Sequence, residues 1–321
     1  MAASIRHPSP TTADVRRASE EILRDRLARL HHVDPRRVFL TAGATEANAA
    51  VLQFLSRRDR AGPRYCRVRY PEYPPLFDAA RYFGWTIRTR PGRYGLALVS
   101  QPRNPEGTLW TDSELERWAE GSRELIVDET FREFSNAPSI AGRDRRRTWV
   151  TGSFTKFFGA DDLRVGYAIV PETSADAFDR YQGLVSDTLP AYSVAGALAC
   201  LDALPRIRGE VKRVTERNLR VLRGALPAPL LAAPLYFDRV PGVRGATVAD
   251  RCLGASVLVC PGGLFGDPTG VRLCLTRRTF PRDFAAYLAV RERLRPLRSA
   301  RPGRSAGGGR LDRTVRKATE R

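Results

Sequence analysis

The sequence predicts an α/β fold in which helices flank a mostly parallel sheet, with a smaller α+β domain in addition. Short β-rich runs alternate with helical segments through the first half of the chain, and a second β-rich part follows a long helical region. The chain has 321 residues, which is more than one core usually holds. We therefore expect two structural units.

The predicted strands are short apolar runs bounded by turn residues. Those of the large domain are 38–41, 65–70, 86–89, 96–100, 125–127, 149–153 and 165–170, and those of the smaller domain are 255–260 and 271–276. The helical spacing of Leu23, Leu27 and Leu30 predicts an amphipathic helix over 12–31. Further helical segments are predicted at 46–55, 75–83, 113–120, 195–204 and 211–222.

These elements suggest a division of the chain. We assign residues 36–205 to a large domain, and residues 1–35 together with 206–297 to a small domain. Residues 298–321 contain eight Arg or Lys, two Asp or Glu, three consecutive glycines and no aromatic residue. This composition predicts a disordered basic tail.

The composition excludes several classes of protein. No apolar run reaches the roughly 18 residues of a membrane span, and the first ten residues lack the apolar stretch of a signal peptide. The five cysteines form no CxxC pair, which argues against a disulfide framework and a zinc site. The three histidines, His7, His31 and His32, are too few and too clustered for a histidine-based triad or metal site. We expect a cytoplasmic protein without a metal.

The net charge of +19 has two interpretations. It can reflect nothing more than arginine-rich codon usage, or it can attract nucleic acid. A non-enzymatic regulator that binds nucleic acid is thus an alternative class, although the chain has no helix-turn-helix or zinc-finger signature. We expect contact with nucleic acid only nonspecifically, through the basic tail, if at all.

Lysine is rare in this chain. Of 54 basic residues only Lys156, Lys212 and Lys317 are lysines. Arginine can replace lysine as a cation, but a guanidinium does not form a Schiff base with an aldehyde. Lys317 lies in the tail and Lys212 in a polar helical pattern, whereas Lys156 lies among aromatic and hydroxyl residues behind an apolar run. Lys156 is therefore a candidate for covalent chemistry, and the alternative is a lysine that snorkels at a strand end.

Four predicted strands end in polar segments, and in such sheets functional groups gather at the carboxyl ends of strands. Each segment alone is ordinary turn chemistry, so the signal lies in their joint order. The segments are Gly43-Ala44-Thr45-Glu46, Arg103-Asn104-Pro105-Glu106-Gly107, Asp128-Glu129 and Ser153-Phe154-Thr155-Lys156.

In this order the segments resemble the class I/II aminotransferases, which are pyridoxal 5'-phosphate (PLP) enzymes of fold type I, over about residues 38–276. Within that family the chain is similar to histidinol-phosphate aminotransferase and threonine-phosphate decarboxylase. The matching motifs are Ser153-x-Thr155-Lys156 with Arg164 eight residues after the lysine, Asn104-Pro105-x-Gly107, Ile126-Val127-Asp128-Glu129, and Pro261-Gly262-x-x-Phe265-Gly266 with Val271-Arg272-Leu273.

The resemblance implies a role for each matching residue. Lys156 would hold PLP as a Schiff base and later move the substrate's α-proton. Asp128 would pair with the pyridine nitrogen, Asn104 would donate to the phenolic oxygen and Tyr73 would stack on the ring. Arg272 would bind the substrate carboxylate, unless it is merely a surface arginine. The phosphate site would comprise Ala44, Thr45, Ser153, Thr155 and Arg164.

Three features depart from the family pattern. Phe131 replaces a frequent tyrosine, so one hydrogen bond to the phenolic oxygen is lost and the Schiff base should hold its proton more tightly. Residues 1–38 contain no Phe, Tyr or Trp, which indicates a shortened N-terminal arm. Asp161 and Asp162 introduce two carboxylates near the implied phosphate site, and we have no physical account of them.

The resemblance implies an aminotransferase that moves an amino group between an amino acid and a 2-oxo acid. The alternative is a PLP-dependent decarboxylase, similar to threonine-phosphate decarboxylase, or another PLP lyase, because a fold does not determine a reaction. The family also implies a homodimer. The sequence does not identify the amino donor or the acceptor.

Overall fold

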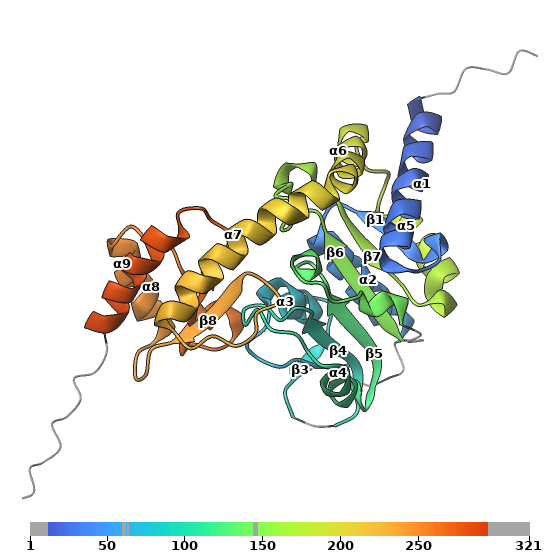
Figure 1. Ribbon diagram of the computed structural model, residues 1–321. Coiled ribbons are helices and arrows are strands. Elements are labelled where there is room, and N and C mark those ends of the chain that lie inside the picture. The colour runs from blue at the N-terminus through green and yellow to red at the C-terminus, as the bar shows by residue number, and fades with distance from the viewer. Residues whose placement is uncertain (1–11, 60–61, 63, 91, 144–146, 295–321) are drawn as a thin grey trace, which may run out of the picture.

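The predicted α/β class is confirmed by the computed structural model, which describes residues 12–294 except 60, 61, 63, 91 and 144–146 (Figure 1). A seven-stranded sheet has the order β1-β7-β6-β5-β4-β2-β3, and β7 alone runs antiparallel to its neighbours. The strands are β1 (Val38–Thr41), β2 (Tyr65–Arg67), β3 (Thr86–Arg88), β4 (Tyr94–Ser100), β5 (Ser122–Asp128), β6 (Thr148–Ser153) and β7 (Gly166–Ile169).

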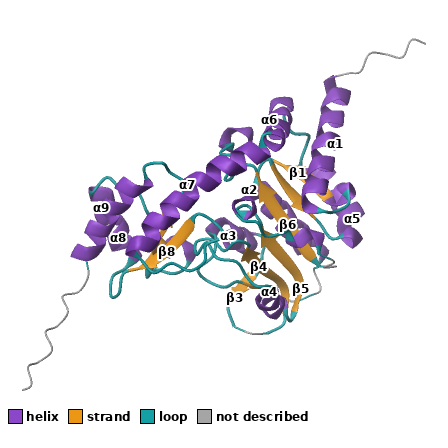
Figure 2. Cartoon of the chain, viewed as in Figure 1, coloured by secondary structure: helices purple, strands orange, loops and turns teal. Residues whose placement is uncertain are grey.

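Helices cover both faces of this sheet (Figure 2). One face carries α1 (Thr12–His31), α4 (Asp112–Ala119) and α6 (Ala191–Asp202), and the other carries α2 (Ala44–Arg58), α3 (Pro74–Tyr82) and α5 (Ala175–Val185). The period-2 alternation of a strand produces these two cores. In β4, Ala97 and Val99 join the core under α1, whereas Leu96 and Leu98 join the core under α2.

A smaller unit follows the long helix α7 (Leu204–Ala225), which runs from the large sheet to the second sheet (Figure 1). That sheet is antiparallel, in the order β8-β10-β9, and it forms a third core with α7 and two further helices. The elements are β8 (Leu235–Arg239), α8 (Gly245–Gly254), β9 (Cys260–Pro261), β10 (Gly270–Cys274) and α9 (Phe280–Arg293).

Short 3₁₀ helices occupy several connections. They are η1 (Pro35–Arg37), η2 (Arg132–Phe134), η3 (Ile140–Gly142), η4 (Asp161–Leu163), η5 (Glu172–Ser174) and η6 (Gly262–Phe265).

The predicted strand over 255–260 is wrong. Helix α8 continues to Gly254, and Ser256 then adopts a left-handed conformation with φ 59°, which an extended strand does not contain. Within this range only Cys260 belongs to a strand.

Helix α1 packs with the large sheet. Leu23 and Leu27 are buried in the same core as Val38 of β1, although we assigned residues 1–35 to the small domain. The domain boundaries themselves stay a prediction. The basic tail lies outside the described residues.

Within the residues that the structure describes, no helix combines the length and the apolar character that a membrane crossing requires.

Strand directions bring the polar segments together. β1, β4, β5 and β6 point the same way, so Thr41, Ser100, Asp128 and Ser153 end at one edge of the sheet. The loop after β4 also contacts the segment that precedes β8, because the backbone N–H groups of Ala232 and Ala233 donate to the carbonyl of Gly107.

Gly107 lies where a side chain has no room. Its φ is 76°, and a Cβ atom there would lie 2.1 Å from the carbonyl oxygen of Leu235 in β8. The loop that carries Asn104 is therefore held tightly against the smaller unit.

Candidate active site

A cavity of about 340 Å³ opens where this sheet edge faces β8 and β10. All the site residues that the sequence predicted line it together, although they come from seven separate segments. They are Ala44, Thr45, Tyr73, Asn104, Asp128, Ser153, Thr155, Lys156, Arg164 and Arg272.

Asp128 is the buried carboxylate of the cavity. Its Oδ2 accepts a hydrogen bond from Asn48 Nδ2 at 3.0 Å, and its Oδ1 accepts one from the Thr130 backbone N–H at 2.9 Å. Asn48 in turn accepts from the hydroxyl of Thr151 at 2.7 Å. Burial raises the pKa of Asp128, and the donors on Thr130 and Asn48 oppose that rise. A cationic ring nitrogen would supply the positive charge that stabilises a buried carboxylate.

The start of α2 also lines the cavity and suits an anion. Gly43 precedes the helix with φ 93° and provides no side-chain cap for its first N–H groups, and the first two helical residues, Ala44 and Thr45, line the cavity. A Cβ atom on Gly43 would lie 2.8 Å from Arg164 Nη2, so glycine lets this guanidinium approach the helix start. Ser153 and Thr155 line the same cavity. N–H groups, hydroxyls and a guanidinium together fit a phosphate.

Asn104 and Arg272 lie side by side. Arg272 Nη1 donates to Asn104 Oδ1 at 3.1 Å, and the guanidinium carbon lies 4.9 Å from the ring centre of Phe265. Because the amide oxygen accepts this bond, the Nδ2 hydrogens of Asn104 are the ones directed to other acceptors. This arrangement fits an amide that donates to a ring oxygen beside a guanidinium that binds a carboxylate.

Glu72 is a second buried carboxyl group, beside Tyr73. Its oxygens accept hydrogen bonds from the Tyr73 N–H at 2.6 Å, the Ser100 N–H at 2.9 Å and the Ser100 hydroxyl. Burial raises the pKa of Glu72 to about 7. Glu72 thus holds the cavity residues Tyr73 and Ser100 in place, and the sequence alone gave no reason to select it.

Other residues of the cavity were also missed. Ser100 and Thr130 lie beside Asp128, and Phe134, Leu235, Cys274 and Thr276 also line the cavity. Asn48 does not line the cavity but fixes Asp128. No local pattern in the sequence marked it, because the same helix carries a second amide, Gln53. Phe131 and Asp161, the two departures noted in the sequence, line the cavity as well.

The other lysines lie elsewhere. Lys212 is exposed on α7, with its Nζ 3.8 Å from Glu216 Oε1, one helical turn away. Lys317 lies outside the described residues. Of the two lysines that the structure describes, Lys156 alone faces the cavity.

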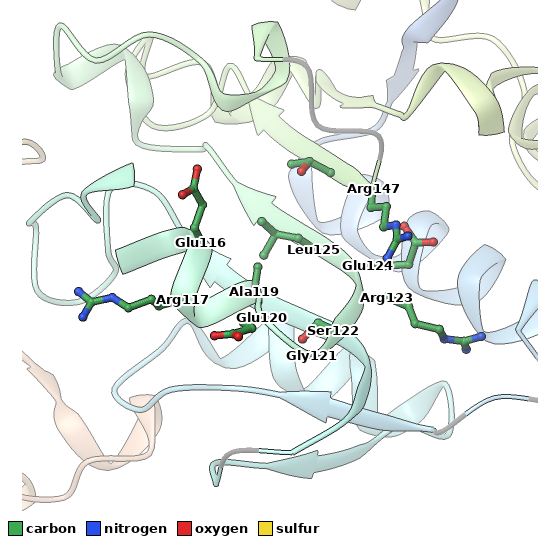
Figure 3. Close-up of a pocket in the computed structure, with 11 residues that line it drawn as sticks. Glu116, Arg117, Ala119, Glu120, Gly121, Ser122, Arg123, Glu124, Leu125 and Arg147 are labelled. Carbon is green, nitrogen blue, oxygen red and sulfur yellow. The ribbon is translucent and has the colours of Figure 1, made fainter. Parts of the chain in front are cut away.

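A second hollow lies at the other end of the strands (Figure 3). It borders the start of β5, and charged side chains of both signs surround it, among them Glu116, Arg123, Glu124 and Arg147. None of the predicted site residues is part of it.

The residues that line the cavity fit PLP, because they include a buried carboxylate, a set of groups that suits a phosphate, an aromatic ring and a lysine. The individual roles stay proposals. The fold is that of the PLP-dependent enzymes of fold type I. The sequence profile of the class I and II aminotransferases matches residues 85–275, more than half of the chain, and the chain belongs to this family, whose cofactor is PLP.

Two relatives are similar in sequence. Histidinol-phosphate aminotransferase 2 of Archaeoglobus fulgidus is 32% identical over 46% of this chain and 44% of its own length. Histidinol-phosphate aminotransferase of Haloquadratum walsbyi is 28% identical over 86% of this chain and 78% of its own length. The chain thus spans less than half of the first relative.

A solved structure shows the shared fold. L-threonine-O-3-phosphate decarboxylase from Porphyromonas gingivalis superimposes with a TM-score of 0.65, at 19% identity, over 84% of this chain and 87% of that chain. At this identity the likeness concerns the fold alone.

Proposed function

We propose that the protein is an aminotransferase that moves an amino group between an amino acid and a 2-oxo acid, with PLP attached to Lys156. The observation that carries the proposal is that ten residues from seven segments converge on one cavity, at positions that suit this cofactor. Family membership supports the same reaction.

Each residue around Lys156 has a separate role in the proposed reaction. When bound, PLP supplies an electron sink for the charge that develops at the substrate's α-carbon. The Lys156 amine accepts the proton from that carbon and then donates it to a different atom. Asp128 holds a proton on the ring nitrogen, because a buried carboxylate favours a cation beside it. Tyr73 and Asn104 orient the ring.

Arg272 orients the substrate by its carboxylate. A guanidinium binds a carboxylate through two parallel hydrogen bonds, and Asn104 fixes the side chain for this contact. We expect Arg272→Ala to weaken amino-acid substrates far more than the amines that lack the carboxylate. Equal losses for both, measured as kcat/KM, would remove Arg272 from this role.

The attachment of PLP to Lys156 can be tested directly. The purified protein should be yellow, and reduction with borohydride followed by peptide mapping should leave the pyridoxyl group on Lys156. Lys156→Ala should lose the covalent label, while Lys212→Ala should keep it. A loaded, folded protein without a label on Lys156 would overturn the proposal.

The choice between transamination and decarboxylation needs a separate measurement. Incubation with a panel of amino acids and 2-oxoglutarate should yield a keto acid without carbon dioxide. Release of carbon dioxide without a keto acid would instead identify a decarboxylase, and this outcome would contradict the proposed reaction.

We further propose that the enzyme is a cytoplasmic homodimer. Members of the family usually form homodimers. In addition, three large apolar side chains at the junction of α5 and α6 are exposed, as expected for an interface: Leu184 (85%), Val185 (51%) and Tyr192 (67%). All five cysteines are free thiols, which suits a reducing compartment. Light scattering on the eluted protein should give twice the chain mass of 35.8 kDa, and a monomer would refute the dimer.

A further inference from the structure

A second cavity, of about 810 Å³, adjoins the cofactor cavity. Lys156, Phe134 and Thr276 line both, so the two spaces meet at the lysine. None of the roles described above uses this second space. A substrate with its amino group at Lys156 can therefore extend into it.

The second cavity has two unlike walls. One wall is aromatic: the ring of Phe157 meets those of Phe134 and Phe158 edge to face, with centres 5.2 Å apart in each pair. The other wall carries three arginines, Arg213 and Arg217 on α7 and Arg278 after β10, together with one carboxylate, Glu210.

The basic wall is held in shape by hydrogen bonds. Asn218, fully buried on α7, donates from Nδ2 to the carbonyls of Leu275 and Arg277 at 2.8 Å each. Arg217 Nη2 donates to the carbonyl of Arg278 at 2.6 Å. These contacts fasten the segment after β10 to α7, so the side chains of Arg217 and Arg278 extend from neighbouring anchored positions.

The protein does not neutralise these three arginines, because Glu210, the one carboxylate of this wall, is paired with Arg206. Other cations of α7 have acidic partners: Arg206 lies 3.5 Å from Glu210, and Arg208 lies 2.8 Å from Glu133. For Arg213, Arg217 and Arg278, the part of the chain that the structure describes offers no carboxylate within 4.0 Å. Like charges gathered in one place repel, and an anionic group between them relieves the repulsion.

We propose that this cavity is a subsite for the far end of the substrate. It takes amino acids or 2-oxo acids with a long or bulky apolar body that ends in a second oxyanion, either a carboxylate or a phosphate-like group. The body lies on the aromatic wall and the oxyanion binds the three arginines, which present the paired N–H groups that oxyanions prefer. This inference rests on the proposed function, because it places the α-carboxylate at Arg272.

The test measures binding without turnover. Calorimetry on the protein with PLP bound would compare dicarboxylates from glutarate to suberate with monocarboxylates of the same lengths. At one chain length the dicarboxylate should bind roughly tenfold or more tightly, as expected for charged hydrogen bonds. An ω-phosphonocarboxylate of that length, compared with the dicarboxylate, tells which oxyanion is preferred.

Variants assign the effect to the wall. Arg213→Gln combined with Arg278→Gln should abolish the preference for dicarboxylates, whereas Arg220→Gln, exposed on the same helix but outside the cavity, should preserve it. All three arginines are exposed, and unchanged thermal unfolding would show that the variants fold.

Two results would overturn the inference: no preference at any chain length, or the same preference in the double variant. Because binding needs no reaction, these results are distinct from a failure of transamination. A protein that binds dicarboxylates through the wall but transfers no amino group would contradict the proposed function and leave the subsite standing.

Discussion

Asn48 illustrates what a single buried amide does at the residue scale. It donates to Asp128 and accepts from Thr151, so it fixes the carboxylate that faces the cavity. We predict that Asn48→Leu weakens PLP binding about 10- to 100-fold, because a hydrogen bond to a charged group contributes about 1.5–3 kcal/mol. Fluorescence titration of the cofactor-free protein measures this change.

The matched control for Asn48 lies on the same helix. Gln53 accepts a hydrogen bond from Tyr181, on α5, and does not line the cavity. Gln53→Leu should leave PLP affinity within about twofold of the original value, since it alters a similar amide without touching Asp128. Similar losses in both variants would mean that the effect of Asn48 is general destabilisation of α2.

Glu72 predicts a pH dependence of stability. Its pKa of about 7 in the folded state lies above the value of 4.5 for an exposed glutamate. Between these pH values the folded protein holds a proton that the unfolded chain releases, so the free energy of unfolding decreases as pH rises through this window. Glu72→Gln removes the titration. Between pH 4.5 and pH 8, the free energy of unfolding of this variant should therefore rise relative to that of the original protein by up to about 3 kcal/mol.

Urea unfolding of the cofactor-free protein at both pH values measures this difference. The relevant quantity is the change with pH, because glutamine cannot accept all the hydrogen bonds that Glu72 accepts from Tyr73 and Ser100. Glu120→Gln, exposed at the end of α4, is the control and should leave the pH dependence as it was. Parallel pH profiles for the original protein and Glu72→Gln would contradict the assigned titration.

At the scale of elements, α1 is fastened to the large sheet rather than to the smaller unit. Leu27 is 1% exposed in the core beneath β1, and His31 at the helix end shares a 2.9 Å hydrogen bond with the Tyr167 hydroxyl. We predict that Leu27→Ala lowers the free energy of unfolding by about 2–5 kcal/mol, as for other buried leucines. Ile22→Ala, on the same helix and 52% exposed, should cost far less. Equal costs in urea unfolding would show that α1 contributes little to this core.

The elements differ in how well the sequence predicts them. β1 was predicted over its observed bounds, because its first three residues form an apolar run and all four of its residues are buried. β8 was not predicted, since its five residues become a strand only by pairing with β10, far along the chain. α8 was missed because glycine stands at both of its ends, and α9 was missed although proline in a first turn, as at Pro281, is compatible with a helix.

The sequence predicted the residues that line the cavity better than the residues that hold them in place. Lys156, Asp128 and Asn104 follow strand ends, where the order along the chain gives their places at one sheet edge. Glu72 and Asn48 act through tertiary contacts between segments far apart in sequence, and no local pattern marks such contacts. The basic wall of the second cavity was hidden for another reason: in a chain so rich in arginine, Arg213 and Arg278 have no distinctive composition around them.

At the scale of the whole molecule, the net charge of +19 predicts a salt-dependent attraction to DNA. Residues 298–321 hold eight of the 54 basic residues without any aromatic side chain to stack on bases. Such contacts release counterions from the phosphates, and each contributes about −0.9 to the slope of log affinity against log salt. Removal of this segment should therefore reduce the magnitude of the slope, by up to about seven.

Retention on immobilised DNA at rising salt, with the full chain and with a chain ending at residue 297, measures the contribution of the tail. PLP binding should be equal in both proteins, because the cavity residues lie between 44 and 276. Two DNA sequences of equal length serve as the specificity control, since phosphate contacts do not depend on base sequence. Binding that distinguishes the two sequences and survives removal of the tail would contradict the prediction, and it would favour a nucleic-acid-binding regulator built on an aminotransferase fold.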